Sequence, residues 1–102
     1  MVKKISLEEF KNLEDEYIVL DLYADWCGPC KMLAPFISEI SEEITNVKFY
    51  KVNVDEEEEL AEMFGVQAIP TIILLKKKQE ISRKIGFVPK NGLLNWIEEN
   101  VK

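Results

Sequence analysis

The sequence has 102 residues, of which 47% are hydrophobic and 10% aromatic, so it can form one packed core and is expected to fold as a single domain over residues 1–102. This composition argues against a disordered chain. The longest aliphatic run, residues 72–75, is far shorter than the roughly 20 residues of a membrane span. The formal net charge of −6 argues against nucleic acid or an anionic membrane as the main partner.

The numbers of histidines and cysteines exclude further classes of catalytic and structural site. The chain contains no histidine, which excludes Cys-His and Ser-His catalysis and metal sites built on imidazole. Its two cysteines are too few for a disulfide-rich secreted scaffold. No apolar segment follows the lysines near the N-terminus, so we expect no signal peptide and a cytoplasmic location. The chemistry of the chain should therefore depend on the cysteine pair.

The residue pattern of the N-terminal part of the chain predicts two strands with a short helix between them. Residues 2–5 form a short strand, and Ser6 and Glu9 then have the spacing of a capping box that opens a helix to about residue 13. The apolar run Tyr17–Tyr23 is typical of a strand that is covered on both faces. The next helix should begin near Pro29 and continue to residue 44, because apolar side chains recur there at helical spacing.

Two features of the middle of the chain are predicted from single residues. Pro35 lies inside the helix that begins near Pro29 and should kink it. A strand at residues 47–54 is followed by an acidic run at residues 55–59. We interpret Asp55 and Glu58 within this run as a capping pair at a helix start rather than a cation site. The remaining elements are a helix, two hairpin strands and a last helix: residues 56–64, 71–76, 81–85 and 89–101.

The order of these elements predicts the fold class. Strands and helices alternate through the first three quarters of the chain, which is typical of parallel crossovers, and a hairpin follows. Lys77, Lys78 and Gln79 occupy the hairpin turn, where a glycine-containing pair is more usual, so the type of turn is not predicted. We expect an α/β protein with a mixed sheet and helices on both of its faces.

The two cysteines lie where the apolar strand passes into the long helix, in the segment Trp26-Cys27-Gly28-Pro29-Cys30. Cys27 precedes the free N–H groups of the helix, whose dipole favours a thiolate, the form that attacks disulfides. Cys30, one turn further on, can close a small disulfide ring. Gly28 permits an unusual backbone and close approach of a partner, and Pro29 fixes φ at the helix start.

A metal site is the alternative to redox chemistry for this pair. Zinc usually has four Cys or His ligands, and the chain has neither a third cysteine nor a histidine. A second chain, or carboxylates, would have to complete such a site, and a shared iron–sulfur cluster meets the same difficulty. A Cys-x-x-Cys pair near a β-α-β pattern favours thiol–disulfide redox chemistry, and we expect no metal.

The motif WCGPCK at residues 26–31, together with Ala68-Ile69-Pro70-Thr71 and Gly86, resembles the thioredoxin family over essentially the whole chain. The resemblance implies the thioredoxin fold, a central mixed β-sheet of about five strands flanked by about four helices. It also implies a protein-disulfide oxidoreductase with no cofactor other than the redox-active Cys27–Cys30 disulfide. Within that pair, Cys27 is the nucleophile and Cys30 the resolving thiol.

The resemblance also gives roles to two charged residues. Asp21 lies within the apolar strand, where a carboxylate is costly unless it is paired, protonated or hydrated. In the family, the residue at this position is an acid/base for the resolving cysteine, and Lys51 is similar to the lysine that lies beside it. A solvent-facing Asp21 and an exposed strand Lys51 are the alternatives.

Five residues are implied in substrate docking. Ile69 and Pro70 match the family's cis-proline loop, which lies opposite the cysteines and pairs with an extended substrate segment. Gly86 permits approach of the partner backbone. Trp26 and Phe87 extend the apolar surface, although ordinary core packing is the alternative for Trp26. Phe87 is bulkier than the small residue often found there, and we expect it to alter partner choice.

The leading functional hypothesis is a general protein-disulfide reductase that a thioredoxin reductase recharges. Its partners are then oxidised protein substrates and that reductase, without nucleic acid or membrane, and we expect a monomer. An oxidase or isomerase of an oxidising compartment is the alternative within the same chemistry, but Gly28 and Pro29 place no charge between the cysteines. A redox-silent docking module is the alternative of another class, and it would not need both sulfurs.

Overall fold

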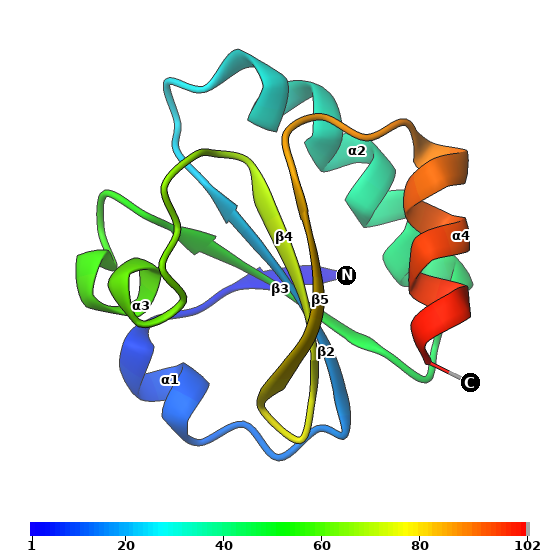
Figure 1. The fold of residues 1–102 in the computed structure, drawn as a ribbon, viewed down its shortest axis with the longest axis horizontal. Helices are drawn as coiled ribbons and strands as arrows, with labels where there is room; N and C mark the ends of the chain where they lie inside the picture. Colours follow the sequence, from blue (N-terminus) through cyan, green and yellow to red (C-terminus); the bar gives the residue numbers. More distant parts are fainter. Residues whose placement is uncertain (102) are drawn as a thin grey trace.

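The computed structural model describes residues 1–101, which form a five-stranded mixed sheet (Figure 1). The strand order is β1-β3-β2-β4-β5; β1 and β2 run parallel to β3, and β4 is antiparallel to both β2 and β5. In chain order the strands are β1 (Val2–Lys4), β2 (Tyr17–Tyr23), β3 (Lys48–Asn53), β4 (Thr71–Lys76) and β5 (Gln79–Ile85).

Four helices cover the two faces of this sheet. They are α1 (Leu7–Lys11), α2 (Gly28–Glu43), α3 (Glu58–Met63) and α4 (Lys90–Asn100). In Figure 1, α2 and α4 lie together on one side of the sheet, with α1 and α3 on the other. The sheet and helices confirm the fold predicted from the sequence. Within residues 1–101, no helix is both long and apolar enough to cross a membrane.

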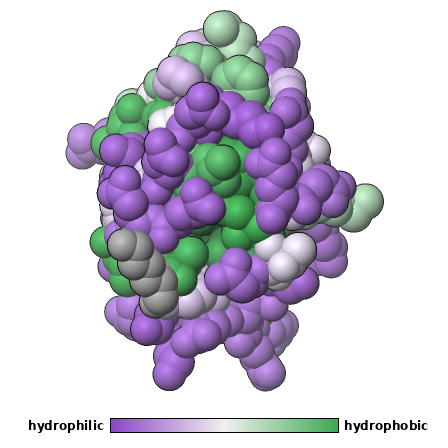
Figure 2. Space-filling view, turned by 90° about the vertical axis from the view of Figure 1, so that its right-hand side faces the viewer, coloured by the Kyte–Doolittle hydropathy of each residue, from purple (hydrophilic) through white to green (hydrophobic). Residues whose placement is uncertain are grey.

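The two faces of the sheet have separate hydrophobic cores. Because side chains alternate along a strand, Val19 of β2 packs against α2 and α4, whereas Leu20 packs toward α1 and α3. Strand β4, which lies between β2 and β5, is buried along Thr71–Leu75, as expected for a continuous apolar run in a strand covered on both faces. On the face formed by α2 and α4, hydrophobic side chains lie in a band between hydrophilic ones (Figure 2).

The boundaries of the N-terminal helices depend on local hydrogen bonds. The capping box at α1 is confirmed, because the Ser6 hydroxyl and the Glu9 carboxylate each accept the other residue's backbone N–H. The helix ends at Lys11, two residues before the expected end. Asn12 follows as the C-cap, and its side-chain amide donates to the Glu8 carbonyl at 3.0 Å. Helix α2 continues through Pro35.

The prediction that Asp55 and Glu58 form a capping pair is wrong. Helix α3 begins at Glu58, later than the expected residue 56, and its N-cap Glu57 makes no side-chain capping bond. The Asn53 side-chain oxygen accepts the backbone N–H groups of Asp55 at 2.9 Å and Glu56 at 3.3 Å, which forms a turn before the helix. This turn leaves the Asp55 carboxylate free for another partner.

The hairpin turn is tighter than the sequence indicated. Strand β5 begins at Gln79, two residues before the expected start, so only Lys77 and Lys78 connect it to β4. Both lysines have left-handed backbones, with φ values of 50° and 65°. Two left-handed residues in a two-residue loop match the twist of a hairpin, although glycine or asparagine adopts them more readily.

Candidate active site

The cysteine pair lies at the junction between β2 and α2. The Cys27 N–H donates to the Ala24 carbonyl at 3.2 Å, which turns the chain after the strand, and Cys27 becomes the N-cap of α2. The backbone N–H of Cys30 donates to Cys27 Sγ at 3.2 Å. Cys27 and Cys30 form a disulfide, with their Cα atoms 5.3 Å apart, and each residue is only 4% exposed.

This position has a direct chemical consequence for Cys27. A helix N-terminus presents unpaired N–H groups and a partial positive charge, both of which favour a thiolate. Because the Cys30 N–H already points at Cys27 Sγ, the helix stabilises negative charge on this sulfur when the disulfide opens. Helix α2 is 16 residues long and has no acidic residue in its first turn to oppose this effect.

Gly28 and Pro29 occupy the first turn of α2 between the cysteines. Proline fits this turn because its missing N–H would have no partner there. The expectation of an unusual backbone at Gly28 is wrong: its φ is not left-handed, and a Cβ atom at this position would contact nothing within 4 Å. The fold therefore does not require glycine here, and a role in the approach of a partner stays a prediction.

Asp21 lies in the interior beside the disulfide. It is 5% exposed, and its Oδ1 atom is buried without a hydrogen-bond partner among residues 1–101. Burial raises the pKa of this carboxyl group to about 7, whereas the positive charge of Lys51 acts to lower it. Lys51 is directly opposite Asp21 in the β2–β3 register. A carboxyl group with this pKa can accept or donate a proton near neutral pH.

One cavity brings Asp21 and Cys30 together. It has a volume of about 150 Å³, and its wall is shared by the strands β2 and β3, the loop after β2 and helix α2. This is enough space for several water molecules, which can carry a proton between groups that do not touch. The lining residues are Asp21, Tyr23, Ala24, Asp25, Cys30, Lys31, Ala34 and Lys51. Tyr23 and Lys31 were not predicted from the sequence to belong to the site.

The loop before β4 lies against the cysteines. Its Ile69–Pro70 peptide bond is cis, and Ile69 packs against the buried cluster formed by Ala24, Cys27 and Cys30. The Pro70 carbonyl accepts the backbone N–H of Gly86 at 2.8 Å, which connects this loop to the end of β5. Gly86 has a φ of 90°, a conformation that other residues rarely adopt. The structure thus places Ile69 against the cysteines and joins Gly86 to Pro70, the residue that follows Ile69.

Two large side chains are exposed near this site. Trp26 is 70% exposed, which rules out ordinary core packing, and its indole Nε1–H donates to the Asp55 carboxylate at 2.9 Å. Phe87 is 40% exposed and packs against Phe36 of α2, with ring centroids 5.9 Å apart. Asp55 and Phe36 were not predicted as partners, because each lies far along the chain from the residue it contacts.

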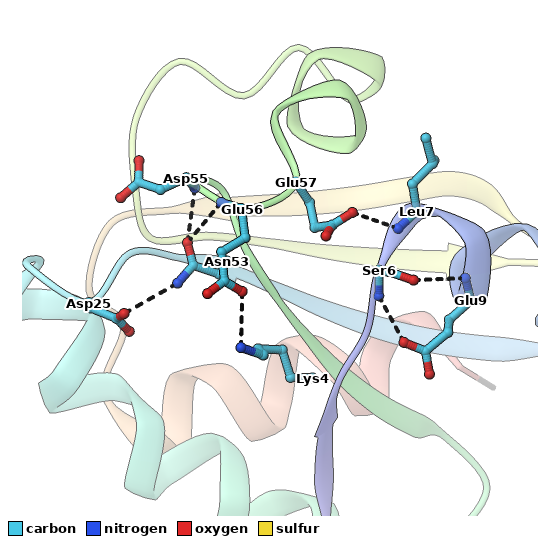
Figure 3. A network of polar contacts seen from close by, with 9 residues as sticks. All are labelled: Lys4, Ser6, Leu7, Glu9, Asp25, Asn53, Asp55, Glu56 and Glu57. Carbon is cyan, nitrogen blue, oxygen red and sulfur yellow. Dashed lines mark hydrogen bonds and ion pairs between the residues drawn. The ribbon is translucent and has the colours of Figure 1, made fainter.

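A polar network supports the loop that carries Trp26. The Asn53 amide donates to Asp25 at 3.5 Å, and its oxygen holds the turn that contains Asp55 and Glu56 (Figure 3). Glu56 in turn forms an ion pair with Lys4 of β1 at 2.9 Å. The network connects three segments, and an asparagine shortly before an acidic helix start was the available sequence signal for it.

Comparison with known proteins agrees with this arrangement. The family model described as Thioredoxin matches residues 1–99. The chain belongs to the thioredoxin family. The thioredoxin of Rickettsia prowazekii is 43% identical over 105 residues, covering 99% of this chain and all of that protein, and the thioredoxin of Chlamydia caviae is 39% identical over 101 residues, covering 98% and 99%. The solved structure of Plasmodium falciparum thioredoxin superimposes with a TM-score of 0.90 at 34% identity and covers 98% of this chain and all of that one.

Membership of the thioredoxin family establishes the general activity. The chain is a protein-disulfide oxidoreductase, and its redox-active pair is the Cys27–Cys30 disulfide. Within residues 1–101, no group of three or more cysteine, aspartate or glutamate side chains is placed to hold a metal ion.

Proposed function

We propose that this chain is a general reductant of protein disulfides, with Cys27 as the attacking thiol and Cys30 as the resolving thiol. The observation that carries the proposal is the position of the disulfide: Cys27 caps helix α2, while Cys30 shares a cavity with the buried Asp21. The two sulfurs therefore have different surroundings. One is stabilised as a thiolate, and the other has an acid/base group nearby.

The reaction then proceeds in two exchanges. In the reduced chain, the Cys27 thiolate attacks one sulfur of a target disulfide, which forms a mixed disulfide and releases the other target sulfur as a thiolate. The Cys30 thiolate next attacks Cys27 Sγ and displaces the remaining target sulfur. Two electrons pass to the target, and the chain is left with the Cys27–Cys30 disulfide that the structure contains.

Asp21 is proposed to accept the proton of Cys30 before the second exchange. Its pKa of about 7 supports this role, because the carboxyl group is then partly ionised at neutral pH. Water in the shared cavity would carry the proton between the two groups. Lys51 is proposed as the partner that keeps the pKa of Asp21 from rising further.

The substrate is proposed to dock as an extended segment beside the cis-proline loop. The Ile69 backbone would pair with it, in a short case of strand addition. Trp26 and Phe87 supply exposed apolar surface for docking, and Gly86 leaves room for the substrate backbone because it carries no side chain. Main-chain pairing with few side-chain requirements suits a reductant of many proteins.

The direction of electron flow is proposed from the residues between the cysteines. Gly28 and Pro29 carry no charge that would stabilise the reduced thiolate and make the disulfide a strong oxidant. We therefore propose a reducing role in the cytoplasm, with recharging by a thioredoxin reductase. The chain would act as one domain and as a monomer, and the disulfide would be its sole redox group.

The reduction potential of the Cys27–Cys30 pair tests this proposal. It is measured by following tryptophan fluorescence in dithiothreitol and glutathione buffers of graded potential. A two-electron transition near or below about −250 mV supports a reductant, since thioredoxin itself has a potential of about −270 mV. A potential above about −200 mV would instead identify an oxidase or isomerase. The absence of a transition would contradict a redox function and favour a docking module.

A further inference from the structure

Tyr23 lies on the same face of the sheet as Asp21. The two residues are separated by one position in β2, so their side chains point to the same side, toward α2. In the neighbouring strand, Lys51 is opposite Asp21, and Lys51 in turn is opposite Lys4 of β1. A row of two lysines and one aspartate thus crosses three strands, and Tyr23 borders this row.

The Tyr23 ring contacts the Lys51 side chain. The ammonium nitrogen of Lys51 is 5.9 Å from the ring centroid, within the range of a cation–π interaction. Tyr23 and Lys51 also line the cavity that contains Asp21 and Cys30. Lys51 is only half-buried and its four-carbon stem is flexible, so a contact with the ring limits the positions its ammonium can take.

The other charged groups near the cavity do not take the place of Lys51 as the positive charge that acts on Asp21. Lys4 is held by the Glu56 carboxylate at 2.9 Å, as Figure 3 shows. Lys31 lines the cavity from α2 and Asp25 from the active-site loop. The adjoining groove has the Glu42 carboxylate and the N-terminal residue Met1 at its edge. Of these groups, only Lys51 has a marked effect on the ionisation of Asp21.

We propose that Tyr23 is a positioning residue that holds the Lys51 ammonium beside the cavity containing Asp21. Burial raises the pKa of the Tyr23 hydroxyl above its usual range, so the ring remains neutral at working pH and attracts the cation through its face. Without the ring, Lys51 would extend into solvent, and less of its charge would act on Asp21. The consequence for catalysis rests on the acid/base role proposed for Asp21, whereas the placement of Lys51 does not.

The experiment is a titration of the Asp21 carboxyl carbon by NMR in the oxidised 102-residue chain, in which the cysteines do not titrate. The wild-type midpoint should lie near pH 7. Tyr23→Leu should raise this midpoint by about half a pH unit, because part of the effect of a nearby opposite charge is lost. Tyr23→Phe retains the ring and should keep the wild-type midpoint. If the Tyr23 hydroxyl were responsible instead, Tyr23→Phe would shift the Asp21 midpoint.

A double-mutant comparison tests whether Tyr23 acts through the lysine. Lys51→Met should raise the Asp21 midpoint at least as much as Tyr23→Leu, and combining the two changes should raise it no further. Additive shifts, or an unchanged midpoint in Tyr23→Leu, would overturn the proposal. If Tyr23→Leu does not fold, Tyr23→Trp replaces it. That variant offers a stronger cation–π face, so the midpoint should stay or fall, and a rise would contradict the proposal.

The pH profile of disulfide reduction separates this proposal from the proposed function. If Asp21 is the acid/base group, Tyr23→Leu should move the profile in the same direction as the NMR midpoint. If the midpoint moves but neither Tyr23→Leu nor Asp21→Asn changes the profile, the positioning role of Tyr23 stands. The acid/base role of Asp21 then fails.

Discussion

Asp21 lies directly opposite Lys51 in the parallel pair of β2 and β3, yet its Oδ1 atom is buried without a hydrogen-bond partner among residues 1–101. Burial is the stronger influence and raises the pKa of Asp21 from 3.8 to about 7. The folded chain therefore binds more protons than the unfolded chain between these two pH values. The free energy of unfolding falls as pH rises through this interval, and the loss is complete above about pH 7.

Replacing Asp21 with asparagine should therefore stabilise the chain at high pH. A change in pKa from 3.8 to about 7 corresponds to at most about 4 kcal/mol, so Asp21→Asn should raise the free energy of unfolding at pH 8 by up to that amount. The gain should nearly vanish near pH 4. Urea unfolding of the oxidised protein at several pH values measures it.

The control for this prediction is an exposed carboxylate. Glu59 lies on the surface of α3, and Glu59→Gln should change the free energy of unfolding by less than about 0.5 kcal/mol at either pH. A gain in Asp21→Asn that is equally large at pH 4 and pH 8 would show that packing, rather than ionisation of Asp21, is responsible.

The hydrogen bond from Trp26 to Asp55 should matter for substrate docking. Trp26 is 70% exposed, so core packing does not fix its ring and the 2.9 Å bond to Asp55 helps to orient it. Asp55→Ala should lower kcat/KM for insulin-disulfide reduction by about three- to tenfold, the range expected for losing one hydrogen bond. The reduction potential should not change, because Asp55 does not contact the sulfurs.

Glu59→Ala provides a matched comparison for Asp55→Ala, because it removes one acidic charge from the same region without removing a bond to Trp26. It should leave kcat/KM near the wild-type value. An equal loss in both variants would attribute the effect to the negative charge of this surface and not to the orientation of the indole.

Local patterns predicted the elements of this fold well. The apolar runs that became β2 and β4 are buried on both faces, and the capping box at Ser6 forms as expected, because each depends on residues close together in sequence. The motif around Cys27 and Cys30 was likewise visible as a local pattern, and it indicated the redox chemistry that the family comparison supports.

Two of the contacts that sequence reasoning missed join residues far apart in the chain, and a third is a local side-chain turn. Asp55 was assigned to a helix cap because Glu58 follows three residues later and apolar residues then recur at helical spacing, but its carboxylate binds Trp26, 29 positions earlier. The side chain of Asn53 competes for the N–H groups at the start of the acidic run, and it delays helix α3. Similarly, Phe36 is apolar at helical spacing, which gave no indication that it would pack against Phe87.

Single-cysteine variants test the order of the two thiols. In Cys30→Ser the attacking thiol remains while the resolving thiol is lost, so incubation with oxidised insulin should accumulate a mixed disulfide that intact-protein mass spectrometry detects. Cys27→Ser should form little adduct, because the Cys30 thiol lacks the stabilisation that the N-cap position gives. The variant with both cysteines replaced by serine measures the background signal, because it has no thiol that can form the adduct. Preferential trapping by Cys27→Ser would reverse the assigned roles.

The hairpin between β4 and β5 offers a stability test remote from the cysteines. Lys77 and Lys78 both adopt left-handed backbones, which cost most residues about 1 kcal/mol relative to glycine or asparagine. Lys77→Asn should therefore stabilise the chain by roughly 0.5–1 kcal/mol, whereas Lys77→Ile should destabilise it, because a β-branched side chain opposes this conformation. Lys78 is a less suitable site, since its ammonium also donates to the Lys11 carbonyl at 2.6 Å. Urea unfolding measures both Lys77 variants, and equal stability of the asparagine and isoleucine variants would contradict a strained turn.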